Sequence, residues 1–260
     1  MDVFVQMPSS IPRRAFAAGL HLLASALVAA IAALLVFRFW YPTPFAAISG
    51  GIVLFWLIVC VDVVLGPALT AVVAAPGKPI AELRRDLMVI VLLQTSAFIY
   101  GIYSLALARP VWIAFEVDRF RVVVAADIDA STLAQAPPEL QALSWTGPKV
   151  VAAVKPSDPE EQVRSIELGL AGFDLSLVPR NWRQYSTQRA VVWNKARPVS
   201  RLLERYPALR EDLSAIASTT GQSIDQLRFL PLVGRGTNWI VLIGVPDARV
   251  IGYLPVDGFL

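Results

Sequence analysis

Long apolar stretches separated by short polar ones make up the first 110 residues, and shorter segments of mixed character follow. Three stretches reach the length of about 20 residues that a helix needs to cross a bilayer. They cover residues 16–37, 52–73 and 87–108. The pattern therefore predicts three transmembrane α-helices within residues 1–109, followed by a separate domain over residues 110–260.

The first stretch has an alternative interpretation as a cleavable signal peptide. A signal peptide has an apolar core of about 7–15 residues and small residues at its cleavage site. Residues 16–37 form a longer apolar run, and no clear site of that kind follows them. We therefore expect the first stretch to be retained as a membrane span.

Positive charge flanks the three stretches unevenly, and this asymmetry predicts their orientation. Basic residues precede the first span and lie between the second and third, at Arg13, Arg14, Lys78, Arg84 and Arg85. The loop between the first two spans has only Arg38, and it has Trp40 and Tyr41 as expected aromatic anchors at the opposite interface. The pattern predicts a cytoplasmic N-terminus and a C-terminal domain outside the inner membrane, which in a bacterium is the periplasm.

The remaining 150 or so residues have the mixed pattern of an α+β domain large enough to bury a core. Clustered β-branched residues predict two strands around Val117 and Asp118, and three more in QLRFLPLVG, NWIVLIGV and ARVIGYLPV. The last two are expected to be joined by a turn at residues 246–247. A helix capped by Asp158 is predicted next to Pro159, and one or two helices interrupted before Pro207.

Composition agrees with a membrane protein and removes several functional classes. The mean hydropathy is +0.58, and 56% of the residues are hydrophobic. One cysteine and one histidine exclude an internal disulfide framework and most metal sites, and both lie within the spans, where a catalytic pair is not expected. The net charge of +3 is too small to indicate nucleic-acid binding. We predict no enzymatic activity, no cofactor and no metal site.

One carboxylate interrupts the second span at its centre. A central Asp costs about 2.5–3.5 kcal/mol on insertion, and each surrounding Leu, Ile, Phe or Val returns about 0.3–0.6 kcal/mol, so the span still inserts. Asp62, Gly66 and Thr70 are four residues apart and are expected on one helix face. Pro67 removes the hydrogen bond to the carbonyl of Val63 and is expected to kink the helix.

Small and polar residues also recur along the third span. Gln94 and Gly101 belong to a stripe spaced by three and four residues, and a weaker stripe in the first span includes His21 and Ser25. Small residues let helices approach closely, and polar ones bond across the contact. Two interpretations stay open for Asp62: it is buried within a three-helix bundle, or it meets a partner's helix or a proton.

These residues resemble a known family. The stretch DVVLGPALTAVV and the segment RRDLMVIVLLQTSAFIYGIYSLALARPVWIAFEVDRF are similar to the type IV pilin accessory proteins of the TfpX/TfpZ kind. The resemblance covers roughly residues 38–120, including the WYP at 40–42. The matching positions are Asp62, Leu65, Gly66, Pro67, Leu69, Thr70, Pro76, Lys78, Asp86, Gln94, Tyr100, Gly101, Arg109, Pro110, Phe115, Asp118, Arg119 and Phe120.

The resemblance implies a bacterial inner-membrane accessory or chaperone protein that supports the stability and assembly of a type IV pilin. The pilin precursor in that picture is one apolar membrane helix with a periplasmic head. The implied partners are the cognate major pilin, the pilus assembly machinery and membrane lipids. The residues expected in helix packing or pilin contact are Asp62, Gly66, Pro67, Thr70, Asp86, Gln94, Gly101 and Arg109. The segment before the first span is longer than the family pattern, which makes Met7 a second candidate start.

Two other functions remain as alternatives at this level. Asp62 and the break at Pro67 would also suit a subunit of an ion- or proton-coupled transport assembly, in which Asp62 carries the charge. A membrane-tethered enzyme would need an active site in the C-terminal domain. The sequence shows no catalytic constellation there, and the pair Asp127 and Asp129 alone does not indicate one.

Overall fold

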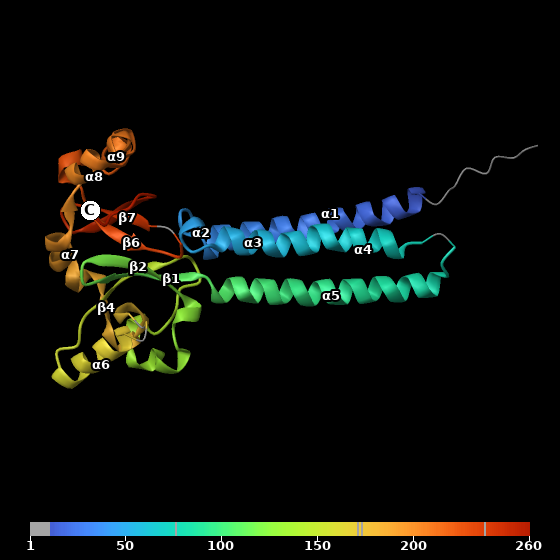
Figure 1. Cartoon of the computed structure of the whole chain (residues 1–260), viewed down its shortest axis with the longest axis horizontal. Coiled ribbons are helices and arrows are strands. Elements are labelled where there is room, and N and C mark those ends of the chain that lie inside the picture. The colour runs from blue at the N-terminus through green and yellow to red at the C-terminus, as the bar shows by residue number, and fades with distance from the viewer. Residues whose placement is uncertain (1–10, 76, 171, 173, 237) are drawn as a thin grey trace, which may run out of the picture. The chain divides into compact units, whose positions relative to one another are not determined.

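The computed structural model describes residues 11–75, 77–170, 172, 174–236 and 238–260. The motif position Pro76 and the candidate start Met7 lie outside the described residues. The chain forms two compact units (Figure 1). The first comprises the residues up to Arg38 together with Gly51–Ala106, and the second comprises Phe39–Gly50 together with Leu107–Leu260.

Long helices make up the first unit. They are α1 (Ile11–Leu35), α3 (Gly51–Cys60), α4 (Gly66–Val73) and α5 (Ile80–Leu107), with π-helical turns at Val36–Trp40 (η1) and Val61–Leu65 (η2). Because α3, η2 and α4 are continuous, they form one span, and the described residues include three helices long and apolar enough to cross a membrane. These cover Ala15–Trp40, Gly51–Val73 and Ile80–Leu107. The predicted three spans and the α+β domain that follows them are confirmed.

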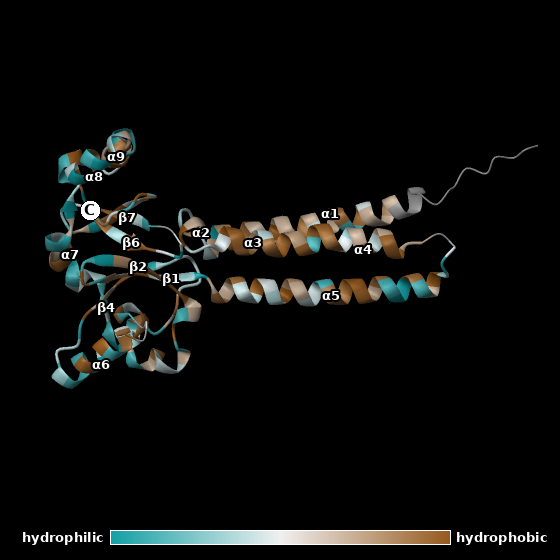
Figure 2. Cartoon of the chain, in the orientation of Figure 1, coloured by the Kyte–Doolittle hydropathy of each residue, from teal (hydrophilic) through white to brown (hydrophobic). Residues whose placement is uncertain are grey.

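Most residues of these helices are apolar, as Figure 2 shows by colour, whereas the first turns of α5 are hydrophilic. Leu23, Trp56 and Leu92 are each more than half exposed. Such continuous exposed apolar surface is unfavourable in water and suits contact with lipid. The third helix begins at Ile80, earlier than the predicted residue 87, because its first turns are built of polar residues that favour helix without being apolar.

A mixed sheet forms the centre of the second unit, in the order β4-β3-β1-β2-β6-β7-β8, with β5 paired to β6. The pairs β1–β3 and β2–β6 are parallel and the others antiparallel. The strands are β1 (Pro110–Glu116), β2 (Arg119–Val124), β3 (Lys149–Ala153), β4 (Trp182–Gln184), β5 (Arg197–Pro198), β6 (Arg228–Val233), β7 (Asn238–Gly244) and β8 (Arg249–Leu254).

Short helices surround this sheet. The α-helices are α2 (Phe45–Ile48), α6 (Pro159–Leu170), α7 (Arg189–Lys195), α8 (Ser200–Arg205) and α9 (Arg210–Thr219). Short 3₁₀ segments lie at Ala125–Asp127, Ala130–Gln135, Pro138–Leu140, Leu175–Leu177, Pro179–Asn181, Tyr185–Gln188, Pro207–Leu209 and Ile224–Gln226. The predicted cap is present, because the backbone N–H of Glu161 donates to Asp158 Oδ2 at 3.0 Å.

Side chains of the central strands alternate between two separate core clusters, as expected for a sheet covered on both faces. Ile113 and Phe115 of β1 belong to one cluster, whereas Trp112 and Ala114 belong to another. A third cluster forms where α8 and α9 pack on β6, β7 and β8, with Leu202 fully buried. The second unit therefore has the layered core of an independently packed domain.

The segment Phe39–Gly50, which links the first two spans in the sequence, supplies part of that core. Phe45 and Ile48 of α2 are 6% and 0% exposed and lie in the same cluster as Ile113 and Phe115. The Phe45 ring is 5.0 Å from the ring of Tyr253 on β8, and the Arg235 N–H donates to the Ile48 carbonyl at 3.0 Å. The segment is thus an integral part of the second unit.

Gly234, in the β6–β7 turn, approaches this segment closely. A Cβ at Gly234 would lie 2.5 Å from Ile48 Cγ2 and 2.8 Å from the Ile48 carbonyl oxygen. Any side chain at Gly234 would overlap Ile48, which explains why glycine stands in this turn. Tyr41 was expected as an aromatic anchor at the membrane interface, whereas its side chain is buried within the protein at 1% exposed.

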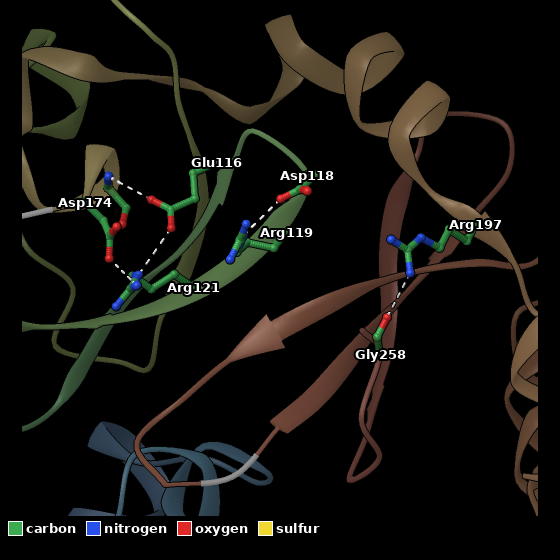
Figure 3. Close-up of polar contacts among 8 residues, drawn as sticks. Glu116, Asp118, Arg119, Arg121, Asp174, Arg197 and Gly258 are labelled. Atoms are coloured by element: carbon green, nitrogen blue, oxygen red, sulfur yellow. Dashed lines mark hydrogen bonds and ion pairs between the residues drawn. The ribbon is translucent and has the colours of Figure 1, made fainter. Parts of the chain in front are cut away.

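Figure 3 shows the polar contacts around the β1–β2 hairpin. Buried Glu116 accepts a hydrogen bond from Arg121 Nε at 3.2 Å and one from the Ser176 N–H at 3.2 Å. Arg121 also pairs with Asp174. The Asp118–Arg119 pair at the hairpin tip is far more exposed. The pair of buried Glu116 and Arg121 therefore fixes the long connection after β3 to the hairpin. The exposed Asp118–Arg119 pair keeps the hairpin tip in contact with solvent.

Candidate functional site

The second span widens into the π-helical turn η2 at the position of Asp62. Asp62 is 9% exposed, and its Oδ1 atom has no hydrogen-bond partner among the residues that the structure describes. Insertions of this kind in helices are rare and often mark functional sites. The predicted disruption before Pro67 is therefore present as a π-turn that places a carboxylate inside the helical unit.

Gln94 of α5 supplies the hydrogen bond that Pro67 cannot. In a π-turn the carbonyl of residue i accepts from the N–H of residue i+5, and five residues after Asp62 stands Pro67, which has no N–H. The Asp62 carbonyl instead accepts from Gln94 Nε2 at 3.2 Å. Side chains of neighbouring helices commonly satisfy backbone groups that a membrane proline leaves free. The sequence pointed to the Val63 carbonyl, and the π-turn moves the relevant group to Asp62.

The small residues of the predicted stripes serve contacts between α5 and the second span. A Cβ at Gly66 would overlap the side-chain amide of Gln94, and one at Gly101 would lie 2.7 Å from Ile58 Cγ1. Gly66 is buried and so is Pro67. Both glycines are thus in close contact with side chains of the same chain.

Thr70 faces a different helix from Gly66. Its hydroxyl lies 2.6 Å from Nδ1 of His21 on α1, and Thr70 is 2% exposed. Gly66 and Thr70 lie four residues apart in α4, yet Gly66 lies against Gln94 of α5 and Thr70 against His21 of α1, so this part of the helix borders both neighbours. His21 was assigned only to a weak stripe, and its pairing with Thr70 has no signal in the sequence.

A cavity of about 410 Å³ lies between α1, α3 with its π-turn, and α5. Most of its walls are apolar, and its polar lining residues are His21, Ser25, Asp62, Gln94 and Thr95. Gln94 Oε1, like Asp62 Oδ1, is buried without a partner among the described residues. Two residues with unsatisfied acceptors therefore line a largely apolar cavity.

The remaining predicted residues lie elsewhere. Asp86, in the first turns of α5, forms an ion pair with Lys78. Arg109 belongs to the second unit, where it is 6% exposed. Its guanidinium carbon lies 3.6 Å from the centre of the Trp145 ring. Its Nε donates to the Ser144 carbonyl at 3.1 Å. Burial lowers the pKa of Arg109 and raises that of Tyr41. The structure brings together Asp62, Gly66, Pro67 and Gln94, and it places Asp86 and Arg109 in separate contacts.

Replacing Gly101 with leucine tests the packing of α5. Because Ile58 fills the space in front of Gly101, we expect the larger side chain to lower the free energy of unfolding of the helical unit by about 1–3 kcal/mol. The measurement is reversible unfolding in detergent micelles or bicelles. Gly19→Leu is the matched control, since a Cβ at Gly19 meets nothing within 4 Å. Equal stability of the two variants would contradict the close approach.

These features define a class of protein: three apolar helices with a largely apolar cavity between them, and a mixed-sheet domain on the same chain. No group of three or more potential metal ligands occurs among the described residues. Residues 9–50 match the family model for Fimbrial assembly protein FimB. This stretch covers α1 and the core-forming segment that follows it.

Comparison with curated proteins extends this match to nearly the whole chain. The chain is 36% identical over 243 residues to a fimbrial assembly protein of serogroup I from Dichelobacter nodosus, and 35% identical over 243 residues to one of serogroup E1. Each alignment covers 93% of this chain and 94% of the relative. A third relative, of serogroups C1 and C2, is 45% identical over 118 residues, covering 45% of this chain and 90% of that protein.

The chain belongs to the fimbrial assembly protein family. The expected resemblance to a type IV pilin accessory family is confirmed by this result. No solved structure matches the chain. The contacts around Asp62 and the core-forming segment between the first two spans therefore rest on this chain's own structure.

Proposed function

We propose that this protein is a non-enzymatic accessory protein of the bacterial inner membrane, which stabilises a fimbrial subunit (pilin) and supports its assembly. The observation that carries the proposal is the end-to-end relation to proteins named for fimbrial assembly. The three long apolar helices support membrane insertion. A layout of membrane helices plus a folded domain suits a client that has one apolar helix and an external head.

The proposed orientation places the N-terminus in the cytoplasm and the second unit in the periplasm. Support comes from the basic residues near the α4–α5 connection, where Lys78 and Arg85 lie close to Asp86. Under this proposal Phe39–Gly50 emerges on the same side as Leu107–Leu260, and the grouping of these two segments in one folded unit requires them to share a compartment.

Deletion of the gene tests the proposed function. We expect the steady-state level of pilin to fall several-fold and surface fimbriae to be lost, with both restored by the wild-type gene on a plasmid. An epitope-tagged copy, purified after crosslinking intact cells, is expected to recover the pilin well above an unrelated three-span membrane protein. Normal fimbriation in the deletion strain, with no pilin in the purified sample, would contradict the proposal.

The transport alternative makes a different prediction for the same chain. A transport subunit would give ion or proton flux in liposomes that Asp62→Asn abolishes. We expect the reconstituted protein to give no flux above empty liposomes, with or without this substitution. Flux that depends on Asp62 would replace the accessory function by transport.

A further inference from the structure

Two residues that line the cavity of the helical unit each have a buried acceptor atom without a hydrogen-bond partner among the described residues. The two atoms are Asp62 Oδ1 and Gln94 Oε1. In a membrane interior an acceptor without a partner is unfavourable, because no water is present there to donate a hydrogen bond to it. Gln94 Nε2 donates to the Asp62 carbonyl, which holds the side-chain amide in place while its oxygen has no partner among the described residues. A donor that enters the cavity can therefore satisfy these acceptors once the Asp62 and Gln94 side chains turn toward it.

The two glycines are packed against side chains of this chain, although Gly101 also lines a second, smaller cavity of about 230 Å³. Gly66 lies against Gln94 and Gly101 against Ile58, both within this chain. The cavity wall formed by α1 is different: Ala24, Ser25 and Ala29 line it, and none of them is buried. Because α1 packs mainly on α4 and η2, whereas α5 meets the second span at Gln94 and Gly101, the cavity separates α1 from α5.

The chemistry of the cavity decides what can fill it. A lipid acyl chain would cover the apolar walls but leave both acceptors without donors. A membrane helix satisfies its own backbone, and one polar side chain on it can supply the missing N–H or O–H. Small residues on the wall allow such a helix to come close, and about 410 Å³ accommodates several side chains from one helix face.

We propose that the cavity between α1 and α5 is the seat of the pilin's membrane helix, and that Asp62 and Gln94 accept hydrogen bonds from a polar side chain on that helix. This inference rests on the proposed function and adds to it the contact face and the chemistry of recognition. It assigns Gly66, Pro67 and Gly101 to building the seat, and Asp62 and Gln94 to recognition. The wall of α1 provides the close approach.

A photo-crosslinking amino acid incorporated in living cells tests the seat. Placed at Ala24, which lines the cavity, it is expected to give a pilin adduct at least about threefold stronger than at Ala26, which does not line it. Asp62→Leu is expected to weaken the Ala24 adduct by about threefold to thirtyfold, the range that one hydrogen bond between membrane helices gives. Asp62→Asn keeps a carbonyl acceptor and is expected to retain most of the adduct.

A second variant leaves both acceptors intact. Ala29→Phe fills the cavity with an apolar side chain, whereas Ala30→Phe places the same side chain on an exposed position outside it. We expect the first to remove the Ala24 adduct and the second to leave it unchanged, with equal amounts of each variant in the membrane. This pair separates loss of the seat from misfolding at Asp62.

The possible results distinguish this inference from the proposed function. If tagged protein recovers pilin but the Ala24 and Ala26 adducts are equal, or neither Asp62→Leu nor Ala29→Phe changes them, the seat is elsewhere and the accessory function stands. Adducts of Ala24 with lipid or with other proteins only would also overturn the inference. If tagged protein recovers no pilin, the proposed function fails and the inference fails with it.

Discussion

Replacing both Phe45 and Ile48 with alanine is expected to unfold the second unit, although both residues precede its first strand by some 60 positions in the sequence. They are 6% and 0% exposed in the main core cluster. Truncating a buried Phe costs about 3–5 kcal/mol and a buried Ile about 2–5 kcal/mol. The combined loss of about 5–10 kcal/mol compares with a total stability of about 5–15 kcal/mol for a domain of this kind.

Limited proteolysis of membranes that contain the variant measures this effect. We expect rapid cleavage within residues 107–260 of the double variant and slow cleavage in the wild type. Val163→Ala with Ile166→Ala is the control, because these side chains on α6 are 58% and 65% exposed and should change stability by no more than about 0.5 kcal/mol. Equal resistance of the two double variants would show that the linking segment is not part of the core.

The second large effect is expected for Arg121→Leu. Glu116 is buried, with 7% of its side chain exposed, and it faces Arg121 across the β1–β2 hairpin. Removing one partner leaves a buried carboxylate uncompensated, which costs about 3–5 kcal/mol. Arg121 is itself 29% exposed, so the expected loss is near the lower end, about 3 kcal/mol. The loss is read from the unfolding midpoint of the second unit.

The neighbouring pair serves as an internal comparison (Figure 3). Arg119 and Asp118 are 40% and 49% exposed, so Arg119→Leu is expected to cost no more than about 1 kcal/mol. Adding Glu116→Gln to Arg121→Leu should recover part of the stability, because the uncompensated charge is then gone. If Arg119→Leu and Arg121→Leu were equally destabilising, burial would not be what gives the Glu116 contact its strength.

Elements with a strong local pattern were predictable from the sequence. The three spans, the β1–β2 hairpin and the strands β6, β7 and β8 follow from apolar length and clustered β-branched residues. The strand β3 was not predicted, and neither were β4 and β5, which have three and two residues. Strands this short have no period of their own, and they exist because a neighbour in the sheet offers hydrogen bonds.

The site was predictable in its residues and not in its contacts. A carboxylate at mid-span and a Gly-Pro pair after it drew attention to Asp62 and Pro67. The hydrogen bond from Gln94 could not be predicted, because the π-turn moves the carbonyl that Pro67 leaves without a donor from Val63 to Asp62. The role of Phe39–Gly50 was missed for a similar reason. Its twelve residues have no amphipathic repeat, and their burial depends on partners far along the chain.

The place of α2 in the core also sets the order of events during synthesis. Phe45 contacts Tyr253, so this contact can form only after about 200 further residues have been synthesised. At about 5–20 residues per second this corresponds to roughly 10–40 s. Through that interval the apolar side chains of α2 have no core to enter, and the second unit cannot close around its N-terminal piece. Completion of this domain therefore waits for β8, and it coincides with that strand joining the sheet.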